Sequence, residues 1–211
     1  MLRNNLIVLL LAAAGLFSSC GNGNHYSLTG SLPARYDGCL VKLTPATFFF
    51  SEEKPSPVDS IKIKDGKFQF VGMVQEPTVY MLTIDGVDYK IPDMASIAVV
   101  IEPGDITMVY DTLGIMVSGT PVNERYMTIG EAKRETVRQR QLLWQERDSV
   151  KRLPGSVENE IDNYYNLKSS AIFKENVIPA SENFIREYAG TEIGEFFFFH
   201  CFGKDVYSKA F

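Results

Sequence analysis

Cys20 is the residue whose position in this sequence most clearly indicates a chemistry. It follows a start that contains Arg3 and an apolar run over residues 6–17, and Ser18 and Ser19 stand directly before it. The run, of about a dozen residues, has the length of the apolar part of a secretory signal and is shorter than the ~20 residues that a membrane-spanning helix needs. A thiol placed after small residues at the end of such a run can be the nucleophile that takes up lipid. We therefore predict a lipoprotein signal peptide over residues 1–19 and lipidation of Cys20.

The segment before Cys20 resembles the lipobox of bacterial lipoproteins, in which the signal peptidase cuts before an acylated cysteine. Two or more acyl chains on this thiol would anchor the chain stably in a membrane. The residues that follow have the sequence GNGN and predict a flexible tether, so residues 20–25 are interpreted as a lipidated tether. Two alternatives stay open: an ordinary cleaved signal in which Cys20 has no role, and an uncleaved anchor.

The other two cysteines, Cys39 and Cys201, are far apart in the sequence and form no Cys-x-x-Cys motif. We expect two separate buried thiols, with a Cys39–Cys201 disulfide as the alternative. Cys201 follows a run of phenylalanines, and apolar surroundings should raise the pKa of its thiol and make it unreactive. The two histidines, His25 and His200, are expected to be structural or solvated.

No catalytic or metal-binding pattern emerges from the remaining polar residues. Asp59 and Ser60 suggest a nucleophile, but no histidine lies near them in the sequence, so a turn or strand-edge role is favoured. Four acidic residues could supply oxygen ligands to calcium, but their spacing fits no calcium-binding loop: Asp85, Asp88, Asp93 and Glu102. Glycine-rich phosphate loops are absent from the sequence. We therefore predict no catalytic residue, no cofactor and no metal.

The charge balance argues against one class of partner. The chain has 21 basic and 26 acidic residues and a formal net charge of −5. Removal of the signal, which contains Arg3 and no acidic residue, leaves 20 basic residues and a net charge of −6. This charge disfavours nucleic acid as a partner and disfavours an electrostatic contact with anionic lipid.

Short alternating or apolar runs bounded by turn residues predict β-structure up to about residue 120. We expect strands near residues 25–32, 38–43, 58–63, 67–72, 77–84, 97–101, 106–110 and 115–119. Asp65-Gly66, between two alternating runs, is typical of a hairpin turn. The continuous apolar run Ile97–Ile101 indicates a strand at the centre of a sheet. A sandwich or an open barrel fits this pattern.

The pattern changes to helical spacing after Thr120-Pro121. We expect helices near residues 123–152, 156–178, 181–188 and 191–202, with Ser156 and Thr191 as N-caps and a break at Ile178-Pro179. The predicted fold is therefore α+β, with an N-terminal antiparallel β-sandwich-like domain over residues 26–120 and a C-terminal helical segment over residues 121–211.

Several short motifs in a fixed order resemble a known family. They are YSLTG at 26–30, VDS at 58–60, DGKFQFVG at 65–72, EP at 76–77, IEPGDI at 101–106 and VSGTPVN at 117–123. Together they look like the Bacteroidetes domain of unknown function numbered 4369. The resemblance implies a place before a thioredoxin-like domain in membrane-attached thiol-disulfide oxidoreductases. Since the sequence ends at Phe211, where that domain would begin, the resemblance transfers no catalytic residue.

Two phenylalanine runs, at 48–50 and 196–199, are the most hydrophobic segments after the signal. Core packing is the simple interpretation of both. Four consecutive phenylalanines cannot all lie on one side of a helix, so the second run predicts burial on more than one face. A contact with a protein partner at the helical segment is the corresponding hypothesis.

The sequence thus favours a non-enzymatic, membrane-anchored accessory or binding module of the cell envelope. The first alternative is a component of a periplasmic thiol-disulfide exchange system that acts with a separate thioredoxin-like protein. The second is a glycan-binding or nutrient-uptake accessory lipoprotein, which predicts exposed aromatic side chains on the sheet. Residues 21–25 lack the acidic cluster that resembles the surface-export signal of this lineage, which favours the periplasmic face of the outer membrane.

Overall fold

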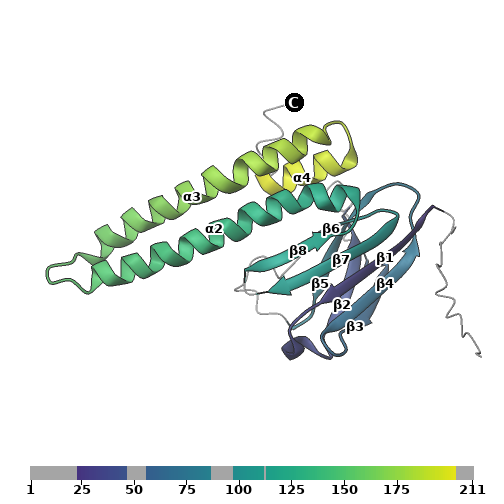
Figure 1. The fold of residues 1–211 in the computed structure, drawn as a ribbon, viewed down its shortest axis with the longest axis horizontal. Coiled ribbons are helices and arrows are strands. Elements are labelled where there is room, and N and C mark those ends of the chain that lie inside the picture. Colours follow the sequence, from purple (N-terminus) through teal and green to yellow (C-terminus); the bar gives the residue numbers. More distant parts are fainter. Residues whose placement is uncertain (1–22, 47–55, 87–96, 112, 203–211) are drawn as a thin grey trace, which may run out of the picture.

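The computed structural model describes residues 23–46, 56–86, 97–111 and 113–202 of the chain. These residues form two four-stranded sheets followed by three α-helices. Figure 1 shows two long helices side by side that extend well beyond the sheets. This architecture confirms the predicted α+β class. The predicted signal peptide, Cys20 and Phe48–Phe50 lie outside the described residues.

The first sheet, here called sheet A, has the strand order β4-β1-β7-β8, and sheet B has the order β3-β2-β5-β6. Sheet A contains β1 (His25–Ser31), β4 (Lys67–Met73), β7 (Gly104–Asp111) and β8 (Gly114–Ser118). Sheet B contains β2 (Leu40–Pro45), β3 (Asp59–Lys62), β5 (Thr78–Ile84) and β6 (Ile97–Ile101). A single 3-10 turn, η1 (Ala34–Tyr36), lies between β1 and β2.

The antiparallel sandwich-like domain that the sequence predicts contains one parallel pair of strands. Strand β1 pairs with β7 in parallel, from Tyr26 opposite Gly104 to Ser31 opposite Val109, while the other paired strands of the two sheets are antiparallel. Parallel neighbours need a long crossover connection. Here the whole of sheet B is formed by the chain between β1 and β7, which supplies that connection.

The turn at Asp65-Gly66 forms as predicted, but it does not join two paired strands. Both residues have positive φ angles, 52° and 69°, as a tight two-residue turn requires. Lys64 and Lys67 exchange two backbone hydrogen bonds across it, of 2.9 and 3.0 Å. Beyond this bridge β3 enters sheet B and β4 enters sheet A, where β4 pairs with β1 over its full length. The turn therefore carries the chain from one sheet to the other.

The apolar run that forms β6 is an edge strand, and the prediction of a central position was wrong. Ile97, Val99 and Ile101 belong to the core between the two sheets, whereas Ala98 and Val100 pack in a second core with the helices. Both faces of β6 are therefore buried. A strand at the edge of a sheet shows the apolar pattern of a central strand when both of its faces are covered.

The helices are α2 (Pro121–Lys151), α3 (Glu158–Glu187) and α4 (Glu192–Phe202). Two helices separated at Ile178-Pro179 were expected where α3 is continuous, with Pro179 inside it. Proline removes one hydrogen bond and crowds the preceding turn. Val177 and Phe184 are buried on either side of it, and this packing holds both halves of the helix in place.

The helix caps follow the sequence in one case and not in the other. Thr191 Oγ1 accepts a hydrogen bond of 3.2 Å from the backbone N–H of Gly194, as predicted for the start of α4. Ser156 does not cap α3, whose N-cap residue is Val157. The Ser156 hydroxyl instead donates to the carbonyl oxygens of Val150, in the last turn of α2, and of Leu153, just after that helix.

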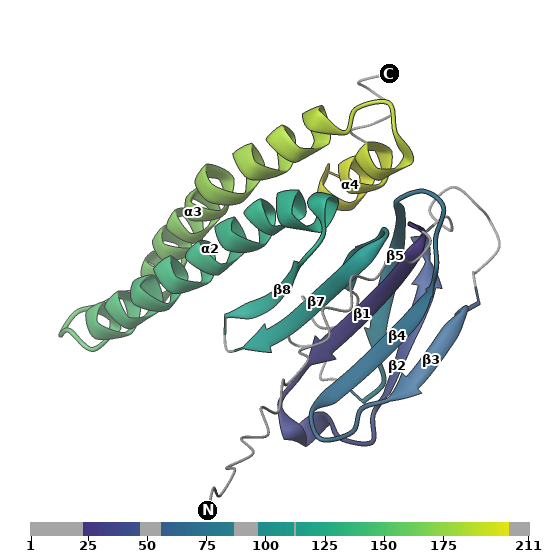
Figure 2. The same ribbon diagram turned by 45° about the vertical axis from the view of Figure 1, so that its right-hand side comes forward.

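Two hydrophobic cores stack on the two sides of sheet B. The first lies between the sheets and contains Leu28, Leu43, Phe70, Leu82 and Met108 among its buried residues. The second joins the outer face of sheet B to the helices, with buried side chains at Val79, Met81, Ile129, Phe184 and Phe197. Figure 2 shows α4 beside the base of the α2–α3 pair, on the side toward the sheets. No helix within the described residues is long and apolar enough to cross a bilayer.

Candidate interaction surface

The buried carboxylate of Glu102 connects the end of β6 to the start of α2. Its Oε1 atom accepts hydrogen bonds from the backbone N–H groups of Val122, at 2.7 Å, and Asn123, at 3.3 Å. The first N–H groups of a helix have no partner within the helix, and a negative charge there also interacts favourably with the helix dipole. Glu102 thus caps α2. Its residue type alone had made it a candidate calcium ligand, and the capping role explains instead why a carboxylate lies here.

Asn123 completes this junction by occupying the free edge of β6. Its side-chain oxygen accepts from the Val100 N–H at 3.1 Å, and its side-chain NH₂ donates to the Val100 carbonyl at 2.6 Å and to Thr120 Oγ1 at 2.8 Å. Asn123 is completely buried. Its amide replaces the neighbouring strand that Val100 lacks, which protects an edge that could otherwise pair with another chain.

Two aromatic–glycine pairs fix the register of β1 against β4. Tyr26 is opposite Gly72, and Gly30 is opposite Phe68. A Cβ atom on Gly30 would lie 1.9 Å from the Phe68 ring, and one on Gly72 would lie 2.7 Å from the Tyr26 ring. Each glycine therefore provides the space in which the aromatic side chain of the facing strand lies. Both pairs come from motifs that carry the family resemblance.

The paired helices α2 and α3, here called the arm, are joined by polar contacts along their length. Near the base, Arg125 makes a two-pronged ion pair with Glu187, with N–O distances of 2.7–3.0 Å. Halfway along, Arg140 donates to the Ser169 carbonyl at 3.0 Å. Toward the tip, the Tyr165 hydroxyl donates to Glu146 at 2.9 Å and Lys151 pairs with Asp162 at 2.8 Å. These contacts hold the two helices as one unit.

The outer face of α3 exposes an apolar stripe, defined here as Tyr164, Leu167 and Ala171, and Val157 is exposed at the position before the helix. Leu167 is 74% exposed, and Val157 and Tyr164 are each 53% exposed. The residues that α3 buries against the rest of the protein include Tyr165, Ser169 and Val177, which lie on another face of the helix. Single exposed apolar residues are ordinary, whereas several on one helix face indicate an interaction surface.

The C-terminal phenylalanine run packs as predicted on more than one face. Phe196 and Phe197 are buried in the second core, and Phe198 and Phe199 are half-buried. His200 is exposed and stacks on Phe196 with ring centroids 5.5 Å apart, which is a structural contact. A pocket of about 160 Å³ adjoins this region, between β8, α2 and His200. Its lining combines apolar side chains, among them Met116 and Met127, with the basic side chains of Lys133 and Arg134.

The two described cysteines are both free, so the prediction of separate thiols is confirmed. The prediction that both are buried was wrong, because Cys39 is half-buried and Cys201 is exposed as a residue. Desolvation of the sulfur nevertheless raises the pKa of the Cys201 thiol, and the Ser181 hydroxyl and Lys133 oppose this rise. A thiol with a raised pKa is a poor nucleophile at neutral pH.

The remaining candidate residues that the structure describes form no site. Asp59 and Ser60 lie on the exposed strand β3, where Asp59 Oδ1 accepts a hydrogen bond of 2.7 Å from the Ser60 N–H. Asp85 forms an ion pair with Lys42 at 2.8 Å. Asp88 and Asp93 lie outside the described residues. Within the part of the chain that the structure describes, no group of three metal-ligating side chains occurs.

His25, the first residue of β1, is exposed.

The described aromatic side chains of the sandwich form no exposed platform. Among the described residues of 26–120, Tyr36, Phe68 and Phe70 are buried, and Tyr26, Tyr80 and Tyr110 are half-buried. The platform that a glycan-binding module predicts is therefore not present on the described part of the two sheets.

A comparison with protein families matches the sandwich and the beginning of the arm. Residues 26–126 fit the family model described as Domain of unknown function (DUF4369). The matched segment includes both aromatic–glycine pairs, Glu102 and Asn123, and it ends within the second turn of α2. No match was found among curated proteins. The motifs quoted for the resemblance therefore correspond to residues that build the sandwich and attach the arm to it.

Proposed function

We propose that this protein is a lipoprotein of the cell envelope, anchored through lipid on Cys20 at the periplasmic face of the outer membrane. In this proposal it is a non-catalytic accessory or binding module, and the arm is the part that binds a protein partner. The sandwich is the scaffold that holds the arm.

The observation that carries this proposal is the apolar stripe on the outer face of α3. The arm is long, is joined internally by ion pairs and hydrogen bonds, and extends beyond the sheets (Figure 1). Its stripe presents apolar side chains on the face that is turned away from α2. An apolar surface on a rigid, projecting element is the arrangement expected of a docking site.

The motif residues support a scaffold role for the rest of the described chain. Glu102 and Asn123 form hydrogen bonds within the junction, and an aromatic ring of the facing strand packs over each of the two glycines, Gly30 and Gly72. The described thiols, Cys39 and Cys201, lie on different elements and form no dithiol. Thiol-disulfide exchange by the protein itself therefore has no residue pair among them to carry it.

Lipid attachment is tested by growing cells that express the full chain with an alkyne-labelled palmitate. We expect label on the wild type and none on a Cys20→Ser variant of equal abundance. A Cys20→Ser variant that is labelled as strongly as the wild type would disprove the anchoring proposal.

The docking role is tested by affinity pull-down of the full chain from detergent-solubilised envelope. We expect bands that the wild type captures to be lost with Leu167→Glu and kept with Leu142→Glu. Leu142 is a matched control because it is 67% exposed and lies on α2. Equal capture by all three proteins would contradict a role for the stripe. Truncation before Asn123 is unsuitable, since it would uncover the second core and the edge of β6.

A further inference from the structure

The most exposed large apolar side chains in the described part of the sandwich lie at the end where β1 begins. Val71 and Met73 of β4 are each 65% exposed, and Val58, directly before β3, is 61% exposed. These three residues are here called the entry patch. Ile61 and Val109, which are exposed elsewhere on the two sheets, reach only 36% and 43%. Val71 and Met73 are two positions apart on an edge strand, so their side chains lie on the same face of sheet A.

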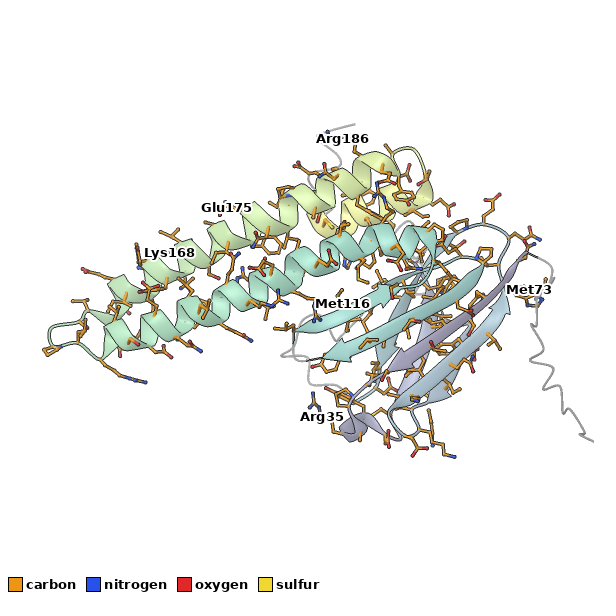
Figure 3. The ribbon with its side chains drawn as sticks, in the orientation of Figure 1. Arg35, Met73, Met116, Lys168, Glu175 and Arg186 are labelled. Carbon is orange, nitrogen blue, oxygen red and sulfur yellow. The ribbon has the colours of Figure 1, made fainter. Side chains whose placement is uncertain are left out.

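The strand register places the entry patch beside the segment predicted to be the tether. Met73 pairs with His25, the first residue of β1, and Val71 pairs with Ser27. Figure 3 shows Met73 at the end of the sandwich where the chain enters β1. The tight turn between β3 and β4 lies at the opposite end, so Val58, at the start of β3, lies at the same end as Met73.

The tether is short compared with the rest of the molecule. Five positions separate Cys20 from His25, and an extended chain covers at most ~3.6 Å per residue, so His25 lies within about 18 Å of Cys20. Paired Cα atoms of antiparallel strands are ~5 Å apart, which places Met73 within about 23 Å. The arm is about 46 Å long, from the 31 residues of α2 at ~1.5 Å each, and its tip lies at the other end of the molecule (Figure 1). Lipid on Cys20 would therefore hold the entry patch, and not the arm, next to the bilayer.

The charged groups that flank the entry patch are mainly acidic. The titratable residues next to it in the sequence or in the sheet, all exposed, are Asp59, Glu76, Asp105 and His25. The lysine of β4, Lys67, is six positions from Met73, about 20 Å away at ~3.4 Å per residue. Among the described residues, attraction between lysines and anionic lipid therefore does not hold this end to a membrane. A contact here has to come from apolar side chains that enter the interface.

We propose that the entry patch contacts the surface of the bilayer in which Cys20 is anchored, with its three side chains between the headgroups of zwitterionic lipid. This inference rests on the proposed lipid anchoring. Because the anchor keeps the patch close to the bilayer, its effective concentration there is high and a small apolar contact is sufficient. The second contact fixes the orientation of the sandwich, which a flexible tether alone leaves free. The arm then projects away from the membrane, where its apolar stripe is accessible to a protein partner.

Spin labelling of the lipidated full chain in phosphatidylcholine vesicles tests this contact. Cys39 and Cys201 are replaced by serine, Cys20 is acylated and takes no label, and a nitroxide is attached to Met73→Cys or to Val109→Cys. Val109 is a matched control because it is exposed on the same face of sheet A, at the end away from the start of β1. We expect oxygen, which concentrates in lipid, to relax the label at Met73→Cys, and a water-soluble nickel complex to relax the label at Val109→Cys. Equal accessibility of the two labels to the nickel complex overturns the proposal.

A substitution separates insertion from simple proximity. With the label at Val71→Cys, Met73→Asp should reduce the ratio of lipid-facing to water-facing label about tenfold, the size of effect expected from one apolar side chain of this exposure. Val109→Asp should leave the ratio unchanged, and so should an increase in salt concentration, because the contact is apolar. A ratio that falls as the salt concentration rises, or that falls equally with both aspartates, contradicts the proposal.

The anchoring proposal and the membrane contact fail in different ways. Palmitate labelling reports the lipid on Cys20 and does not depend on the entry patch. A chain that takes up palmitate and floats with the vesicles, but whose label at Met73→Cys faces water, keeps the anchoring proposal and refutes the contact. A chain that takes up no palmitate refutes both.

Discussion

Replacing Asn123 by alanine removes three hydrogen bonds from a completely buried position and leaves the edge of β6 without its partner. The backbone N–H and carbonyl of Val100 both lose the group that satisfies them. Each of these two buried polar groups left without a partner costs roughly 1–3 kcal/mol, so the expected loss in the free energy of unfolding is about 2–6 kcal/mol. Thr120 Oγ1 also loses the donor that the Asn123 NH₂ supplies, and the range above counts the two Val100 groups alone.

This loss is large compared with the total stability of a folded domain, which is about 5–15 kcal/mol. At roughly 2–4 °C per kcal/mol for a chain of this size, the melting temperature should fall by about 4–24 °C. Urea unfolding, followed by circular dichroism and by the fluorescence of Trp144 on α2, measures the loss in the free energy of unfolding. A thermal melt measures the change in melting temperature. Asn163→Ala is the control, because Asn163 is exposed on α3. A loss below about 0.5 kcal/mol for Asn123→Ala, or one equal to that of the control, would refute the edge-partner role.

Three further changes test other parts of the structure. Gly30→Ala should destabilise the sandwich strongly, because its Cβ atom would lie 1.9 Å from the Phe68 ring, whereas Gly23→Ala, with nothing within 4 Å, should be silent in the same thermal melt. Glu102→Gln keeps an acceptor for the start of α2 but loses the charge, so it should cost less than Glu102→Ala, and urea unfolding of both variants measures the difference. The raised pKa of Cys201 predicts slow alkylation by iodoacetamide at pH 7 that accelerates as the pH increases, measured peptide by peptide in mass spectrometry; a rate at pH 7 equal to that of a free cysteine peptide would contradict it.

The sequence predicted most strands and helices because their signals are local. The alternating runs of β1 and β4, the Asp65-Gly66 turn and the Thr191 cap are each decided by residues within a few positions of one another. The partner of a strand is not decided in this way. The tight turn fixes the backbone at Asp65-Gly66. Strand β4 nevertheless belongs to sheet A, because it pairs with β1 there over its full length.

The position of β6 and the continuity of α3 depend on contacts between distant parts of the chain. An apolar strand covered by helices on one face and by a second sheet on the other has the same sequence pattern as a central strand. Pro179 is a strong helix breaker by local rules, and only the burial of Val177 and Phe184 shows why the helix continues. Tertiary packing decided both outcomes.

The junction residues were overlooked for a related reason. Glu102 and Asn123 stand 21 positions apart, and neither belongs to a capping motif that is contiguous in sequence. A usable signal was nevertheless present, since an acidic residue directly after an apolar strand and an asparagine in the first turn of the following helix are both suited to unpaired backbone groups. Their appearance in two quoted motifs of the same family resemblance indicated a shared structural role.

The residues that build the fold and the exposed apolar residues of α3 lie in different parts of the chain. The residues matched by the family model, 26–126, build the sandwich, protect its edge and fix the first turns of α2. The apolar stripe lies on α3, outside the matched segment. A scaffold of this kind can carry different surfaces on its arm without a change in its core, because substitutions on an exposed helix face cost little stability. On the proposed docking role, α3 would decide which partner binds, and changes at Tyr164 and Leu167 should alter binding while leaving the fold intact.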